Sequence, residues 1–170
     1  MDTSTFATQR TRTIALSLAL LFNLSAVALP QDRQRYVPDP KLTPGDTIAV
    51  TKDDVCGTRH RPLVDAIPIR VKSQVFARYG ISTAGPSSYN IDHLIPVKLG
   101  GSNSIKNLWP QPLSGEWNYV LKNKLERQLQ KKVCKGEIEL RTAHQEIATD
   151  WVSAYKKYVG EARRAQRKLN

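Results

Sequence analysis

The sequence predicts an α+β fold whose core is a hairpin of two short strands with the helix that follows it, flanked by additional helices. Tyr89–Leu94 and Asn107–Pro110 are short segments separated by a Gly-Gly-Ser-Asn turn at 100–103, a pattern typical of paired strands. Residues 116–134 then carry Leu or Val at positions 121, 125, 129 and 133, which is the spacing of an amphipathic helix. A chain of 170 residues with 40% hydrophobic residues can bury the core of one such domain.

Residues 1–28 are expected to be a secretory signal peptide. Arg10 and Arg12 precede an apolar run, Ile14–Phe22, that is too short to span a bilayer, and the small residues Ala26–Ala28 follow it. Cleavage after Ala28 would export the protein to the periplasm or out of the cell, with no membrane span in the mature chain. An uncleaved N-terminal anchor is the alternative, and polar residues interrupting the apolar run disfavour it.

The mature chain is expected to begin with an extended lead-in at 29–47, rich in proline and charge, that does not pack. A single domain then covers 48–160, and 161–170 is a basic tail. Within the domain, residues 48–50 could begin a short strand, and Asp53-Asp54 is typical of a turn.

Two further helices are expected. One runs over residues 67–79, with Pro68 in its first turn and Gly80 just beyond its end. The other runs from about Leu140 to Tyr158 and is expected to bury Ile147, Trp151, Ala154, Tyr155 and Tyr158.

The chain is strongly basic, with a formal net charge of +11. This excess favours a polyanionic partner, which could be nucleic acid, an anionic envelope surface or an acidic protein. The chain is expected to be a monomer.

Two cysteines are present, Cys56 and Cys134. An exported protein meets an oxidising compartment, so an even number of cysteines favours a disulfide. Two buried free thiols are the alternative, and a metal site is disfavoured because no CxxC pair occurs.

Asp92 and His93 are the candidates for chemistry. Histidine titrates near neutral pH and suits a general base, and a carboxylate beside it could hold a divalent cation on a phosphate. Adjacent strand residues point to opposite faces, so both can serve one site only where the strand ends or twists. Asn107, after the turn, could hold the loop that carries His93 because its amide both donates and accepts hydrogen bonds.

The order IDHLIP, LGG and NLWPQ, followed by a helix, resembles the HNH endonucleases, which have the ββα-metal or His-Me finger fold. It is most similar to small exported bacterial proteins with an HNH-like domain. Four further motifs of those proteins occur here in order: Val55-Cys56, Tyr79-Gly80, residues 133–136 (VCKG) and residues 147–151 (IATDW).

The resemblance implies a metal-dependent nuclease, and DNA rather than RNA is the expected substrate. It makes Asp92 a metal ligand, His93 the general base and Asn107 the residue that orients it. The last metal ligand would be Asn118 or Asn123, with Asn123 slightly favoured. Ligands of this type suit Mg²⁺ or Mn²⁺.

Three positions depart from the resemblance. Asn90 and Lys98 stand where the similar proteins carry Glu, and Asn123 stands where they carry Asp. Each change removes a carboxylate and would weaken metal binding. The alternative function is therefore a non-catalytic exported protein that keeps the fold and binds nucleic acid or an envelope polyanion.

Cationic side chains on the helix after the hairpin are candidates for phosphate contacts, namely Lys122, Lys124 and Arg127; a solvated helix face is the alternative. Trp109, Trp117 and Trp151 are expected in the core rather than stacked on bases. His60 and His144 are expected to be surface or packing residues.

Overall fold

The computed structural model describes residues 1, 36–57, 65–82 and 88–160. Except for Met1, the expected signal peptide lies outside the described residues, as do His60 and the basic tail at 161–170. In the part that is described, no helix has the length and apolar character needed to cross a membrane.

The fold combines helices with one antiparallel hairpin, as the α+β prediction requires. The strands pair so that Asp92 lies opposite Trp109 and His93 lies opposite Leu108. The elements in chain order are α2 (Lys52–Cys56), α3 (Ile69–Arg78), β1 (Tyr89–His93), the 3₁₀ helix η2 (Val97–Leu99), β2 (Leu108–Pro112), α4 (Tyr119–Cys134), α5 (Leu140–Tyr155) and the π-helical turn η3 (Lys156–Gly160).

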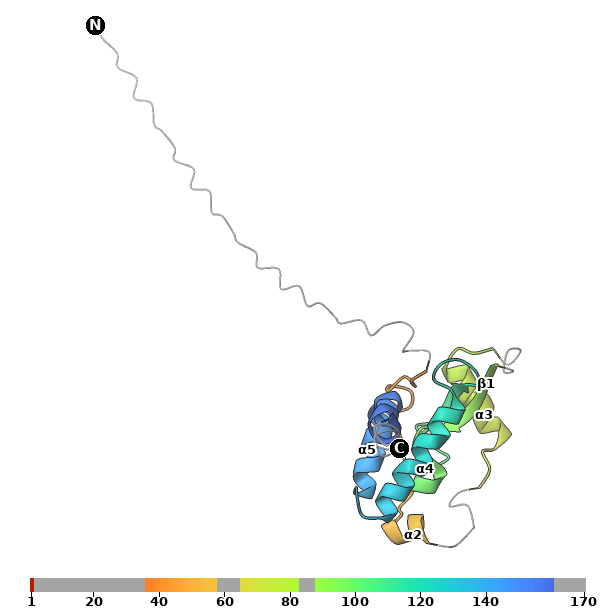
Figure 1. The fold of residues 1–170 in the computed structure, drawn as a ribbon. Helices are drawn as coiled ribbons and strands as arrows, with labels where there is room; N and C mark the ends of the chain where they lie inside the picture. Colours follow the sequence, from red (N-terminus) through yellow and green to blue (C-terminus); the bar gives the residue numbers. More distant parts are fainter. Residues whose placement is uncertain (2–35, 58–64, 83–87, 161–170) are drawn as a thin grey trace.

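The main core lies between α4 and α5. Figure 1 shows α4 between α5 on one side and the hairpin with α3 on the other. The predicted stripe of α4 supplies three fully buried side chains, Leu125, Leu129 and Val133. The predicted face of the last helix is also buried, with Ile147, Trp151, Ala154, Tyr155 and Tyr158 all in this cluster.

The tryptophans pack as expected. Trp109 and Trp151 are buried, and Trp117 makes edge-to-face contacts with Trp151 and Tyr155 at centroid distances of 6.0 and 5.6 Å.

A smaller apolar cluster attaches α3 to one face of the hairpin. Val75 of α3 packs with Ile91 of β1 and Leu108 of β2, and all three are buried. The hairpin is therefore covered by α3 on this face. The strand residues that alternate with these point to the opposite face.

The short strand predicted at 48–50 is wrong. Only Thr47 forms a bridge, with Gly101, and α2 begins soon afterwards. Thr51 and Asp54 form a capping box, in which the Thr51 hydroxyl accepts from the Asp54 amide and the Asp54 carboxylate accepts from the Thr51 amide. This cap makes residues 52–56 helical where the sequence analysis expected a turn at 53–54.

Residues 36–47 lack helix, as expected, but the expectation that they do not pack is wrong. The buried Thr43 hydroxyl donates to the Leu108 carbonyl at 3.0 Å, and the Gly45 amide donates to the Lys106 carbonyl at 2.9 Å. The indole of Trp151 donates to the Tyr36 carbonyl at 2.7 Å. The segment thus covers the base of the hairpin and belongs to the domain.

The last helix is kinked at Asp150, whose backbone is non-helical at φ −163° and ψ 93°. Its carboxylate accepts from the amides of Val152 and Ser153 at 3.0 and 3.1 Å, which is the bonding of a new helix cap. The chain then widens into the π-helical turn η3 and ends the described fold at Gly160.

Cys56 and Cys134 form the disulfide that was expected, with their Cα atoms 5.4 Å apart. The bond joins the end of α2 to the end of α4. It closes a loop with a sequence separation of 78, within which the entire hairpin lies.

Replacing both cysteines with serine is expected to lower the free energy of unfolding by about 4 kcal/mol, because a cross-link over a long loop restricts the unfolded chain. Urea unfolding of the oxidised protein and the double variant measures the difference. Adding a reductant to the double variant is the control and should change nothing. A loss below about 1 kcal/mol would contradict the expectation.

Candidate functional site

The loop from Leu94 to Asn107 is held by the side chain of Asn107, which is fully buried. Its Oδ1 accepts from the Ile95 amide at 2.9 Å. Its Nδ2 donates to the carbonyls of Ile95 and Ser102 at 2.9 and 3.0 Å. The amide thus clamps both arms of the loop, and Asn107 acts on His93 through the backbone without touching its ring.

Gly101 allows the two arms to approach each other. A Cβ at this position would lie 1.7 Å from the Ile95 carbonyl oxygen, so no other residue fits without moving the backbone. Gly100 beside it has φ 83°, in the left-handed region. The Gly-Gly pair therefore gives the loop the shape that Asn107 fixes.

The ring of His93 is positioned by Asn103, a residue that the sequence analysis assigned only to the turn. His93 Nε2 lies 2.8 Å from Asn103 Oδ1, and Asn103 Nδ2 donates to the Asp65 carbonyl at 2.8 Å. The second bond fixes the orientation of the amide, so Oδ1, which can only accept, faces the imidazole. Neutral His93 therefore carries its proton on Nε2 and has its free lone pair on Nδ1.

Asp92 and His93 are directed to different elements. Asp92 lies in a pair with Lys122 of α4, whereas the His93 ring contacts the loop residue Asn103. Within the residues that the structure describes, no hydrogen bond joins the two side chains. His93 is the last residue of β1, so the two groups flank the end of the strand from opposite faces.

Lys122 is fully buried, so it fits neither the predicted phosphate contact nor the alternative of a solvated helix face. Its Nζ lies 2.7 Å from Asp92 Oδ2 and 2.6 Å from Glu126 Oε1, and it donates to the His93 carbonyl at 2.5 Å. The three N–H groups of the ammonium thus have three oxygen partners. We call Lys122, Asp92 and Glu126 the ion cluster.

The charge state of the ion cluster follows from its contacts. Burial by itself would lower the pKa of the Lys122 ammonium, but Asp92 and Glu126 more than offset it, so this pKa lies above its ordinary value. Burial raises the pKa of the Glu126 carboxyl, and Lys122 acts against that rise. Lys122 is therefore a permanent cation at neutral pH, next to a carboxyl group that burial disfavours as an anion.

The two candidate asparagines of α4 differ in their roles. Asn118 caps the helix: its Oδ1 accepts from the amides of Val120 and Leu121 at 3.0 and 3.4 Å, so the oxygen proposed as a metal ligand is already used. Asn123 is exposed and follows Lys122 directly. Of the two, Asn123 is the one whose side chain is exposed on the surface of α4.

Arg127 lies one turn beyond Asn123 and is exposed, and Lys124 is partly exposed. Lys131 continues the same exposed line toward the end of the helix. These side chains form a basic strip on α4 beside the ion cluster.

The hairpin face that carries Asp92 has polar groups in two successive cross-strand pairs. Asp92 lies opposite Trp109, and Asn90 lies opposite Gln111. Trp109 Nε1 and Gln111 Nε2 are buried without a partner in the described part of the chain. Unpaired buried donors reduce stability, by about 1–3 kcal/mol each, which is untypical of a face that serves packing alone.

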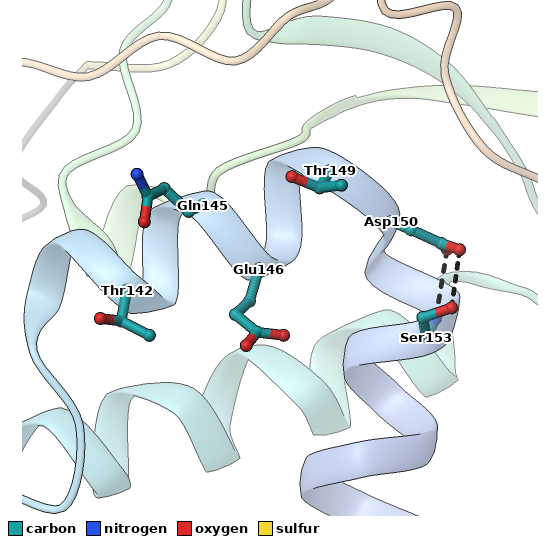
Figure 2. A pocket seen from close by; sticks show the side chains of 6 residues that line it. All are labelled: Thr142, Gln145, Glu146, Thr149, Asp150 and Ser153. Atoms are coloured by element: carbon teal, nitrogen blue, oxygen red, sulfur yellow. Dashed lines mark hydrogen bonds between the residues drawn. The ribbon is translucent and has the colours of Figure 1, made fainter.

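The described residues also form a pocket elsewhere, along α5. Figure 2 shows side chains from successive turns of the helix, with Asp150 turned toward Ser153 across the kink. The pocket is lined by Thr142, Gln145, Glu146, Thr149, Asp150 and Ser153. None of these residues belongs to the site at the end of β1.

His144 has a structural role, as expected. Its Nε2 lies 2.6 Å from the Leu99 carbonyl, which ties α5 to η2.

Comparisons with known proteins do not identify a family: no family model matches the chain, and no match was found among curated proteins or solved structures. Among the described residues, no group of three or more His, Cys, Asp or Glu side chains is placed to hold a metal ion.

Replacing Asn107 with alanine is expected to reduce the free energy of unfolding by about 2–4 kcal/mol, because buried groups of Ile95 and Ser102 lose their partners. Asn103→Ala is the matched control, since Asn103 is only partly buried, and it should cost less than about 1 kcal/mol. Chemical denaturation of both variants measures the contrast. Equal losses would refute the role given to the Asn107 clamp.

Replacing Lys122 with methionine is expected to destabilise the protein by about 3–5 kcal/mol, because two carboxylates are left without their cation. Adding Glu126→Gln should recover more than half of this loss, since the remaining carboxylate, Asp92, has 30% of its side chain exposed. Urea unfolding of the single and double variants provides the comparison. A double variant as unstable as Lys122→Met would show that charge burial is not the cause.

Proposed function

We propose that this protein is an exported, metal-dependent endonuclease of the HNH type that hydrolyses phosphodiester bonds of nucleic acid, with DNA preferred over RNA. The observation that carries the proposal is the arrangement at the end of β1. There an imidazole with its free lone pair on Nδ1 and a partly exposed carboxylate come from adjacent residues at the end of a strand, which a stiff loop follows.

His93 would act as the general base. Its Nδ1 takes a proton from a water molecule, and the resulting hydroxide attacks phosphorus while the ester oxygen leaves. The positive charge that develops on the ring is stabilised by Asn103 Oδ1, which accepts a hydrogen bond from Nε2–H throughout. The clamp at Asn107 keeps the strand end, and with it the ring, in one place.

The residues present fit a hard cation that is shared with the substrate. Mg²⁺ in proteins is held by one or two carboxylates together with phosphate oxygens and water, and Asp92 offers one partly exposed carboxylate. Asn123 would supply an amide oxygen from the exposed side of α4. When bound, Mg²⁺ or Mn²⁺ would stabilise negative charge on the phosphate and on the leaving oxygen.

The basic strip of α4 would hold the nucleic acid strand. Lys124 and Arg127 project from α4, whose Lys122 contacts Asp92 of β1, so phosphates bound to them would lie near the end of β1. The net charge of +11 supports the same kind of partner.

A second function is favoured by two observations. The Lys122 ammonium already pairs with Asp92, and no carboxylate stands at position 123. A protein with these features could bind a polyanion through its basic strip without cleaving it.

Replacing His93 with alanine is expected to slow cleavage by about 10²–10⁴-fold, the usual contribution of a general base. Purified, disulfide-bonded protein is incubated with plasmid DNA or RNA in Mg²⁺, in Mn²⁺ and in EDTA, and nicked products are quantified. His144→Gln is the matched control and should keep full activity. Cleavage that persists in His93→Ala would refute this assignment, and binding without cleavage under either metal would favour the second function.

Replacing Asn103 with alanine is expected to lower kcat roughly tenfold with little change in KM, because one hydrogen bond that orients the ring is lost. Asn103→Asp keeps an acceptor for Nε2 and should restore most of the rate. Steady-state kinetics on a short duplex separates the two parameters. A rise in KM without a fall in kcat would mean that Asn103 serves substrate binding instead.

A further inference from the structure

Lys122 differs from the other cations near the site because it is completely buried and fully bonded. Its three N–H groups are directed to two carboxylate oxygens and one backbone carbonyl, at 2.5 to 2.7 Å. Carboxylate and carbonyl oxygens are also the ligands that a hard divalent cation prefers. The ammonium therefore fills a position lined by the kind of atoms that would otherwise coordinate a metal ion.

Lys122 also limits what Asp92 can do. One oxygen of Asp92 is already 2.7 Å from the ammonium, and the carboxylate reaches solvent only through its exposed 30%. A metal ion bound there would meet a positive charge a few ångströms away, at the buried side of the same carboxylate. Like charges at such a distance repel, and the repulsion is screened less at a partly buried position than in water.

A phosphodiester would offset the repulsion between the metal ion and the ammonium. Its negative charge attracts both the metal ion and the ammonium, so a metal ion and a phosphate that share Asp92 each favour binding of the other. Such a coupling is reciprocal by thermodynamic necessity.

We propose that Lys122 is a built-in cation that competes with the metal ion for Asp92, so that the free protein binds the metal ion weakly and takes it up together with nucleic acid. Lys122 is in this sense a positioning residue, which also fixes the end of β1 through the His93 carbonyl. The inference rests on the proposed function in taking Asp92 as a metal ligand and nucleic acid as the partner.

The test measures Mn²⁺ binding directly, by the electron paramagnetic resonance signal of free Mn²⁺. The key comparison is between Glu126→Gln and the double variant Lys122→Met with Glu126→Gln, which differ only in the ammonium. The double variant is expected to bind Mn²⁺ at least tenfold more tightly, and adding Asp92→Asn should abolish the gain. Equal affinities would overturn the proposal.

A matched control excludes a simple effect of net charge. Lys132 forms an ion pair with Glu137 at 2.7 Å on the surface of α4, so Lys132→Met with Glu126→Gln removes the same charge away from Asp92. This variant should bind Mn²⁺ as Glu126→Gln does. An equal gain in affinity would overturn the proposal.

A second measurement needs no change at Lys122 and so does not depend on the folding of that variant. In His93→Ala, which holds DNA uncut, a short duplex should raise the affinity for Mn²⁺ at least tenfold. No change on adding the duplex would overturn the proposal. Failure of the nuclease assignment is a separate result, because it shows as absence of cleavage in the intact protein, whereas all arms here measure metal binding.

Discussion

The buried ammonium of Lys122 is the interaction on which the arrangement of this protein depends. It joins the end of β1 to α4 through the His93 carbonyl and the Asp92 carboxylate, and it neutralises Glu126 one turn along its own helix. Apolar packing holds α4 to α5 and the hairpin to α3, in two separate clusters. The ion cluster is the polar link between these two halves. A buried ion pair is weak evidence for stability but strongly penalises any arrangement that separates its partners, so it specifies how the hairpin meets α4.

The loop between the strands adds a second constraint. Asn107 and Gly101 bring residues 95 and 102 together, and Asn103 on the same loop holds the His93 ring. His93 is thus fixed twice, at its backbone by Lys122 and at its ring by Asn103. Asp92 is fixed only on the side that faces Lys122 and keeps an exposed part. Under the proposed function, a rigidly held imidazole and a neighbouring residue whose carboxylate keeps one open side would suit a reaction at a charged group that arrives from solvent.

Much of the fold could be predicted because apolar periodicity and turn chemistry act locally. The stripe at 125, 129 and 133 and the strands on either side of Gly100-Gly101 follow from such signals, whereas the disulfide follows from the export signal and the even number of cysteines. The incorrect predictions share a different cause. The Thr51 cap turned an apparent turn into α2, the Asp150 cap broke a continuous helical pattern, and Lys122 was assigned to solvent by its charge. In each case a polar side chain found a partner that periodicity does not reveal. Asn103 was missed because asparagine in a glycine-rich turn is ordinary, and its role depends on a histidine ten residues away.

The position of Lys122 also gives a reason why an amide could stand at Asn123. In a site that already contains an ammonium, the charge of an incoming metal ion has to be balanced by the substrate phosphate rather than by further carboxylates of the protein. Glu126, the other carboxylate of the ion cluster, is paired with Lys122 and buried. A carboxylate at 123 would hold the metal ion before nucleic acid arrives, whereas an amide oxygen adds a ligand without adding charge. Under the proposed function, the amide at 123 and the lysine at 122 would act in the same direction, toward a site whose metal ion is held jointly by the protein and its substrate.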